Sequence, residues 1–200
     1  FNIDDTEYKK ILNSKNLSLN EEIGVLKKNR VKVLNLKSKN YPEDLRNISQ
    51  PPVFLYYKGD ISLLENRKIG VVGTRKATSY GRITCEKMTE DLVSNEITTV
   101  SGLALGIDSI CHKRTLEKSG KTIAVVGSGL DIIYPKENRI LWEQIERSGL
   151  IISEYPLGTE PIGYNFPMRN RIIVGLSRGI LVIESQKKGG SLITAELALE

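Results

Sequence analysis

The feature that most constrains this chain is a rhythm of strand, glycine loop and helix that repeats from residue 68 to the end. Apolar strands begin the runs KIGVVG (68–73), ITTVSGLALG (97–106), TIAVVGSG (122–129), LIISEYP (150–156) and ILVIES (180–185). Helical patterns fill the stretches between and after them: 79–95, 107–120, 136–149, 168–179 and 190–200. Alternation at this spacing is typical of a parallel sheet joined by helical crossovers.

The strands are continuous apolar runs rather than alternating ones, which indicates that helices cover both faces of the sheet. We therefore predict an extended Rossmann-like α/β fold, a doubly wound and mostly parallel sheet with right-handed crossovers. Residues 31–36 and 53–57 add two short strands before the repeating part, with prolines between them.

A helical apolar pattern runs from Tyr8 to about Lys28. We expect residues 1–28 to be the remnant of an N-terminal helical domain, followed by one Rossmann-like, DNA-binding domain over residues 29–200. The chain begins with Phe1 rather than Met and stops inside a helical pattern at Glu200. We therefore expect a fragment whose second domain is truncated at its C-terminus.

In open α/β sheets, ligands bind beyond the carboxyl ends of the strands, so the loop after each strand is a candidate site. Glycines and hydroxyl side chains fill these loops, and helix N-termini there offer backbone N–H groups to phosphate. The candidates are Gly73, Thr74 and Arg75, then Ser101, Gly102, Gly106 and Asp108, then Gly127, Ser128 and Gly129, and finally Gly189, Gly190, Ser191 and Thr194. The alternative for any single loop is that glycine only makes a tight turn.

Several enzyme classes lack their signatures here. Neither G-x-G-x-x-G nor G-x-x-x-x-G-K-[ST] is matched, which disfavours a nicotinamide enzyme and a P-loop NTPase. Cys85, Cys111 and His112 cannot supply four zinc ligands at useful spacing, and His112 is expected to pack or hydrogen-bond within a helix. We expect no cofactor, no metal and no nuclease or ATPase turnover.

The charge balance favours a polyanionic partner, because the net charge is +5 and the pI is about 9.1. No apolar run reaches the roughly 18 residues of a membrane span, and no secretory leader opens the chain. We expect a cytoplasmic protein without a membrane partner.

The segment from Asn165 to Glu196 combines cations, apolar runs and a Lys-Lys-Gly-Gly-Ser turn. We expect Phe166 to precede a helix and to stack on an unpaired base. Arg169 and Arg171 suit bidentate phosphate contacts, and Asn170 suits a base or backbone contact. The competing interpretation places one arginine in a buried ion pair and Phe166 in the core.

Seven segments occur in an order that resembles the DNA-processing protein family DprA, also called Smf, from about Val31 to the end. They are YPEDLRNISQPPVFLYYKG, GVVGTRKATSYG, SGLALGIDSICHKRTL, TIAVVGSGLDIIYPKEN, SEYPLGTEP, FPMRNRIIVGLSRGILVIES and GGSLITAELAL. The resemblance implies a bacterial cytoplasmic protein of natural transformation that acts as a homodimer. It would bind and protect incoming single-stranded DNA and help to load the RecA recombinase, without enzymatic activity.

The resemblance also implies site residues. The family's glycine-x-arginine motif falls on Arg75, and its F-P-x-R-N-R motif on Phe166, Arg169, Asn170 and Arg171. Its S-G-x-A-x-G-I-D motif falls on Ser101, Gly102, Gly106 and Asp108, and its G-G-S-L-I-T-A motif on residues 189–195. Some members carry a DNA-binding lysine shortly before F-P, where this chain has Gly163, Tyr164 and Asn165.

Two other functions remain open from the sequence. A LOG-type nucleotide phosphoribohydrolase has a related fold, but its P-G-G-x-G-T-x-x-E signature is only partly met by KKGGSLITAE, which lacks the proline and the third glycine. A protein-interaction scaffold without a ligand is the third possibility.

Overall fold

The computed structural model describes residues 19–186 and 189–199, and its chain divides into two compact units, residues 1–32 and 33–200. In the first unit the described helix is α2 (Leu19–Lys28). Glu21 and Glu22 lie in its first turn and Lys27 and Lys28 in its last, which matches the helix dipole at both ends. Residues 1–18 of the expected helical remnant lie outside the described part.

A sheet with the strand order β1-β2-β6-β5-β4-β3-β7 organises the second unit. Its strands are β1 (Lys32–Asn35), β2 (Phe54–Gly59), β3 (Lys68–Gly73), β4 (Thr98–Ser101), β5 (Thr122–Val125), β6 (Leu150–Ser153) and β7 (Ile180–Ile183). Strands β3 to β7 are parallel to their neighbours in this group, whereas β2 runs antiparallel to β6. The Rossmann-like, mostly parallel sheet is confirmed.

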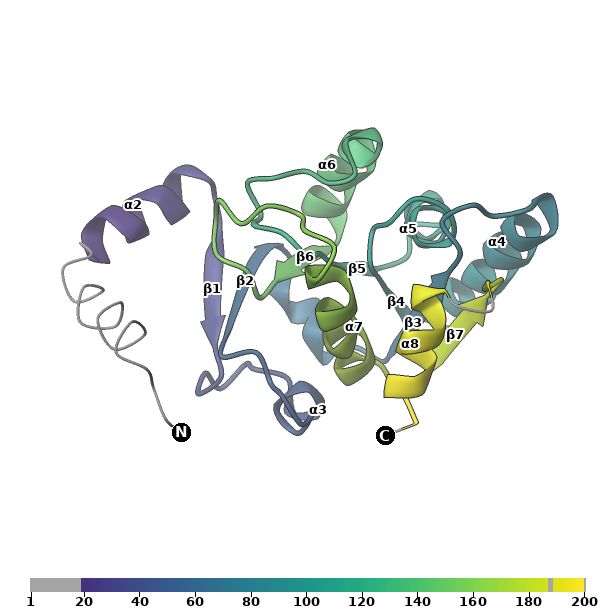
Figure 1. Ribbon diagram of the computed structural model, residues 1–200, viewed down its shortest axis with the longest axis horizontal. Helices are drawn as coiled ribbons and strands as arrows, with labels where there is room; N and C mark the ends of the chain where they lie inside the picture. Colours follow the sequence, from purple (N-terminus) through teal and green to yellow (C-terminus); the bar gives the residue numbers. More distant parts are fainter. Residues whose placement is uncertain (1–18, 187–188, 200) are drawn as a thin grey trace. The chain divides into compact units, whose positions relative to one another are not determined.

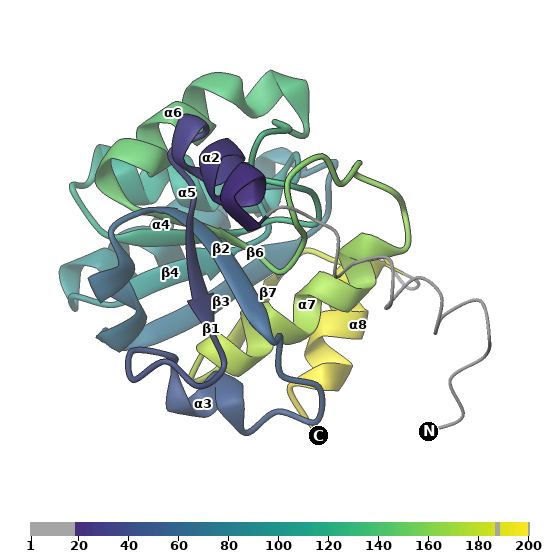
Figure 2. The ribbon, with the colours of Figure 1, turned by 90° about the vertical axis from the view of Figure 1, so that its left-hand side faces the viewer.

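Helices cover both faces of this sheet (Figures 1 and 2). On one face lie α4 (Ser79–Ser94), α5 (Ile107–Glu117) and α6 (Arg139–Ser148). On the other lie α3 (Glu43–Arg46), α7 (Asn165–Leu176) and α8 (Gly190–Leu197). Two 3₁₀ turns, η1 (Ile61–Glu65) and η2 (Lys136–Asn138), complete the elements that the structure describes.

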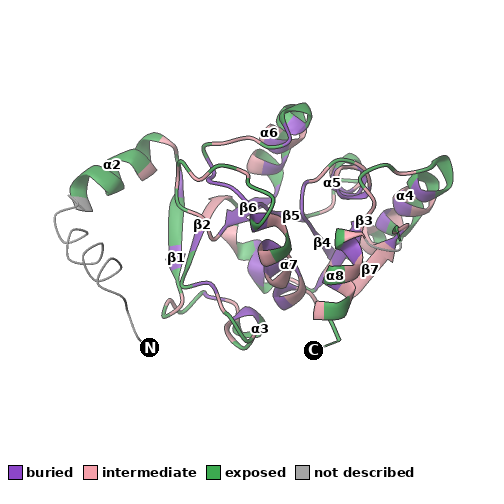
Figure 3. Ribbon diagram, in the orientation of Figure 1, coloured by how far each residue is buried: buried purple, intermediate pink, exposed green. Residues whose placement is uncertain are grey.

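Burial follows this layering (Figure 3). Every residue of β4, β5 and β6 is buried, because each of these strands has a neighbour on both sides and a helix layer on both faces. The larger apolar cluster joins β2–β6 to α3 and α7 through side chains such as Leu45, Leu55 and Ile172. The smaller cluster joins β3 and β7 to α4 and α5, and it contains the free thiols of Cys85 and Cys111. Burial raises the pKa of Cys85 to about 11 and of Cys111 to about 12, so both are inert thiols.

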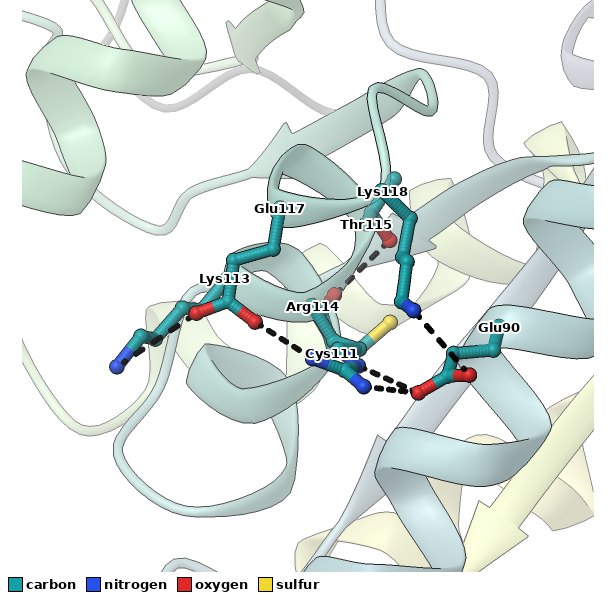
Figure 4. A network of polar contacts seen from close by, with 7 residues as sticks. All are labelled: Glu90, Cys111, Lys113, Arg114, Thr115, Glu117 and Lys118. Atoms are coloured by element: carbon teal, nitrogen blue, oxygen red, sulfur yellow. Dashed lines mark hydrogen bonds and ion pairs between the residues drawn. The ribbon is translucent and has the colours of Figure 1, made fainter.

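An ion-pair network joins α4 to α5 on the outer surface (Figure 4). Arg114 pairs with Glu90 across the two helices and with Glu117 at 3.0 Å on its own helix. Lys118 reaches the second oxygen of Glu90 at 3.5 Å. The hydrogen bond from Arg114 lowers the pKa of Glu90. These side chains are partly exposed, so each pair contributes little to stability.

Candidate functional site

A cleft of about 740 Å³ opens at the carboxyl ends of β3 and β7, between the N-terminal turns of α7 and α8. Parallel strands deliver their following loops to one edge, which is why segments far apart in sequence meet here. Ten of the fourteen residues expected to contact DNA line this cleft: Gly73, Thr74, Arg75, Phe166, Arg169, Asn170, Gly189, Gly190, Ser191 and Thr194. The remaining four are Ser101, Gly102, Gly106 and Arg171. Lys187 and Lys188 lie outside the described residues.

The rim of the cleft carries an exposed cation on an aromatic pair. The guanidinium of Arg75 lies over the ring of Phe166, 5.7 Å from its centroid. Tyr134 stacks on the same Phe166 ring with centroids 5.6 Å apart and an interplanar angle of 30°. Arg75 is exposed, Tyr134 is 40% exposed and Phe166 is partly buried. A guanidinium and two aromatic rings are therefore accessible at one place on the rim.

Phe166 lies inside α7 rather than before it, which corrects the expected helix start. The helix begins at Asn165, so Phe166 and Pro167 occupy its first turn. Proline is compatible with that turn because the N–H it lacks has no intrahelical acceptor there. Asn165 fixes the start of the helix, since its buried amide donates to the carbonyl of Gly127 at 3.0 Å.

Arg169 forms part of the floor of the cleft and is only 5% exposed. Its guanidinium donates to the carbonyls of Gly102, at 2.8 Å, and Val125, and its Nε donates to Oδ1 of Asn170 at 3.2 Å. Burial lowers its pKa to about 10, against the opposing effect of the nearby Asp108. The guanidinium of Arg169 therefore already has acceptors inside the protein. The side-chain oxygen of Asn170 is one of them.

Asp108 is the buried carboxylate beside this arginine. Its Oδ2 accepts from the backbone N–H of Gly102 at 3.1 Å and of Ala104 at 3.4 Å. Burial raises the pKa of Asp108, while the charge of Arg169 and these N–H groups act in the opposite direction. A Cβ on Gly102 would lie 2.5 Å from Nη2 of Arg169 and 2.7 Å from Oδ2 of Asp108, so only glycine fits between the two charges.

Arg171 points away from the cleft. It forms two hydrogen bonds to the carboxylate of Glu154, at 2.9 and 2.5 Å, and both side chains are less than one fifth exposed. The interpretation that one arginine of the R-N-R motif sits in a buried ion pair thus describes Arg171. Its contact with DNA remains a prediction, and the cleft lining does not include it.

Ser101 and Gly106 support the cleft from behind. The Ser101 hydroxyl is fully buried and donates to the carbonyl of Val71 at 2.6 Å. Gly106 has φ +79°, and its α-carbon faces the backbone of Thr74 and Arg75 so closely that a Cβ would overlap both. Gly102 lines a small cavity of about 50 Å³ next to the main cleft, together with Arg75, Phe166 and other residues.

The single histidine takes no part in the cleft. His112 is fully buried in α5, and its Nδ1 lies 2.6 Å from the hydroxyl of Thr122. Burial lowers its pKa to about 3, so the imidazole is neutral at physiological pH. Among the residues that the structure describes, no group of three or more His, Cys, Asp or Glu side chains could hold a metal ion.

Two contributors were missed from the sequence. Tyr134 lies in the loop after β5 and lines the cleft, but only Gly127, Ser128 and Gly129 of that loop were selected from the sequence. Its position directly before Pro135 could have indicated it. Glu184 follows β7 and holds the loop that carries Arg75, through hydrogen bonds to Thr74 and Thr78. No local pattern marks a glutamate for that role.

The fold and the cleft together define a Rossmann-like α/β protein with a cationic, aromatic cleft at the carboxyl edge of its parallel strands. The family model of DNA recombination-mediator protein A matches residues 32–200. The chain therefore belongs to this family, and the expected DprA/Smf resemblance is confirmed.

Individual relatives agree with this assignment. The DNA processing protein DprA of Streptococcus pneumoniae is 48% identical over 160 residues, which is 80% of this chain and 56% of that protein. The Smf protein of a Synechocystis strain is 50% identical over 165 residues, covering 80% of this chain and 42% of that protein. The chain thus spans about half the length of the curated relatives it matches.

Solved structures show the same fold. The crystal structure of the Streptococcus pneumoniae protein superposes with a TM-score of 0.82 at 45% identity and covers 85% of this chain and 60% of that one. A DNA processing protein A from Helicobacter pylori, described for its single-stranded DNA binding mode, gives a TM-score of 0.78 at 34% identity. That match covers 84% of this chain and 76% of the other.

Proposed function

We propose that this chain binds single-stranded DNA in the cleft between α7 and α8 and serves DNA processing in natural transformation. The observation that carries the proposal is the exposed Arg75 held over Phe166, with Tyr134 stacked on the same ring. Family membership and the single-stranded DNA binding described for the Helicobacter pylori relative support it.

The composition of the cleft suits an unpaired strand. Arg75 and Lys76 are exposed cations beside the first turn of α8, where backbone N–H groups lack intrahelical acceptors. Tyr134 is 40% exposed, so part of its ring is accessible to a base, and stacking of this kind tolerates any base. Phosphate contacts likewise position a strand without reading its sequence. Binding should therefore be tolerant of sequence and stronger for single strands than for duplex.

The finer parts of the function rest on the family resemblance. We propose that the protein protects the incoming strand, assists RecA loading on it and works as a homodimer in the cytoplasm. Within the described residues no helix is long and apolar enough to cross a membrane. We also propose that it is not an enzyme. The relatives described above give no support to the phosphoribohydrolase alternative.

Fluorescence anisotropy with labelled oligo-dT, a mixed-sequence strand and a blunt duplex, each at two salt concentrations, tests the proposal. Arg75→Ala should weaken binding of both single strands equally and reduce the log–log salt slope by roughly 0.7. The matched control is Arg178→Ala. It removes an exposed arginine at the amino end of β7, whereas the cleft lies at the carboxyl ends of the strands, and Arg178 pairs there with Asp44 at 3.4 Å.

Equal affinity of wild type and Arg75→Ala for oligo-dT would refute binding in this cleft. Duplex binding as tight as single-strand binding would refute the preference for an unpaired strand. Release of base from nucleoside monophosphates, assayed in parallel, would favour the phosphoribohydrolase instead.

A further inference from the structure

Glu184 is a strained residue at the junction between β7 and the loop that leads to α8. Its φ of +53° lies in the left-handed region, which residues other than glycine adopt rarely. Such a conformation persists where surrounding contacts hold it. Its carboxylate lies beside the first turn of α4, and its side chain is partly buried.

Two hydrogen bonds join Glu184 to one segment, residues 74–78, which we call the Arg75 loop. Its backbone carbonyl accepts from the N–H of Thr74 at 2.8 Å, and its Oε2 accepts from the N–H of Thr78 at 2.9 Å. One residue therefore holds both ends of the loop that carries Arg75 and Lys76 to the rim of the cleft.

Gly81 gives an independent sign of the same arrangement. It lies in the first turn of α4, where its N–H donates to the hydroxyl of Thr78 at 3.1 Å. Alanine is intrinsically better than glycine in a helix. Here, however, a Cβ would overlap Oε2 of Glu184, so the glycine leaves the space that the carboxylate occupies.

We infer that Glu184 is a positioning residue that holds the Arg75 loop so that Arg75 lies over Phe166 at the cleft. The inference rests on the proposed function, because it matters for binding only if Arg75 contacts the strand. Charge alone would act in the opposite direction, since a carboxylate near a DNA phosphate weakens binding. Removing the carboxylate should therefore weaken DNA binding if Glu184 acts by positioning, and strengthen DNA binding if it acts only through its charge.

Glu184→Gln and Glu184→Ala separate the two roles. Both variants remove one negative charge, and only glutamine keeps an oxygen that can accept from the N–H of Thr78. We expect Glu184→Gln to bind oligo-dT at least as tightly as wild type. Glu184→Ala should bind about two- to tenfold more weakly than Glu184→Gln, as expected for the loss of one hydrogen bond. Both affinities are measured well below the melting temperature of each variant, so that only folded protein is compared.

Gly81→Ala tests the same contact from the other side and keeps Glu184 in the chain. Its new methyl group should displace the carboxylate and weaken binding relative to wild type by about the factor that separates Glu184→Ala from Glu184→Gln. Combining Glu184→Ala with Arg75→Ala should cost no more affinity than Arg75→Ala alone, because the glutamate acts through the arginine.

Equal affinity of the alanine and glutamine variants at position 184, or full additivity with Arg75→Ala, would overturn the inference. If Arg75→Ala alone weakens binding while both Glu184 variants bind alike, only the positioning role fails. If Arg75→Ala also binds like wild type, the proposed function fails with it.

Discussion

Replacing Arg169 with alanine should damage the stability of the protein before it affects any contact with DNA. The guanidinium is 5% exposed and donates to the carbonyls of Gly102 and Val125. Its removal leaves those acceptors without that donor, and it leaves the carboxylate of Asp108 buried without its neighbouring positive charge. Breaking a buried charge pair from one side typically costs about 3–5 kcal/mol.

For a domain of this size, that loss corresponds to a fall in melting temperature of roughly 6–20 °C. Thermal and urea unfolding, followed by circular dichroism, measure it. Arg178→Ala is the control, because its exposed ion pair with Asp44 should contribute at most about 1 kcal/mol. Adding Asp108→Asn to Arg169→Ala should recover part of the loss, since it removes the uncompensated charge.

The pH dependence gives a second test. Burial raises the folded-state pKa of Asp108 above its unfolded value, and loss of Arg169 should raise it further. A group with a raised folded-state pKa contributes stability at low pH and loses it as pH rises through that pKa. The deficit of Arg169→Ala against wild type should therefore be smaller at pH 5 than at pH 8. Wild-type melting combined with a salt slope reduced by about 0.7 would refute this reasoning and make Arg169 a phosphate ligand.

Three further predictions follow from the same geometry. Phe166→Ala should weaken oligo-dT binding by about 1–3 kcal/mol with a salt slope closer to that of wild type than to that of Arg75→Ala; a slope reduced as much as by Arg75→Ala would contradict stacking. Arg171→Ala should destabilise the fold by about 2 kcal/mol through the loss of its ion pair with Glu154, which chemical denaturation measures, and anisotropy on the folded variant tests its predicted contact with DNA. Because burial lowers the pKa of His112 to about 3, its contribution to stability should fall by about 1.4 kcal/mol per pH unit below roughly pH 6.5, and His112→Asn should lack that slope in urea titrations.

The repeating part of the fold was predictable because its signals are local. The apolar run at 68–73 coincides with β3, and the pattern at 79–95 exceeds α4 by one residue. A short apolar run that ends on glycine and precedes a helical pattern can be recognised as a strand from neighbouring residues alone. The antiparallel pairing of β2 with β6 was not predicted, since it depends on contacts between segments nearly a hundred residues apart, such as Tyr56 with Ser153.

The candidate site was predictable as a set of loops but not as a set of side-chain directions. Arg169 and Arg171 were assigned to the same surface, although residues two apart on a helix face different sides. The helical pattern predicted at 168–179 already contained both residues, so the helix period alone could have separated them. Tyr134 was missed for a different reason, because no periodicity governs the direction of a side chain in the loop after β5.

The position of β7 has a consequence for how the cleft forms as the chain is synthesised. It pairs with β3 through partners such as Gly70 and Ile180, so the sheet gains this neighbour of β3 only after the three intervening strands β4, β5 and β6 and their helices have been synthesised. Contacts of such long range slow folding. Because α8 follows β7 and Glu184 holds the loop that carries Arg75, a nascent or clipped chain that ends before residue 180 lacks these parts of the cleft, and a complete cleft marks a fully folded domain.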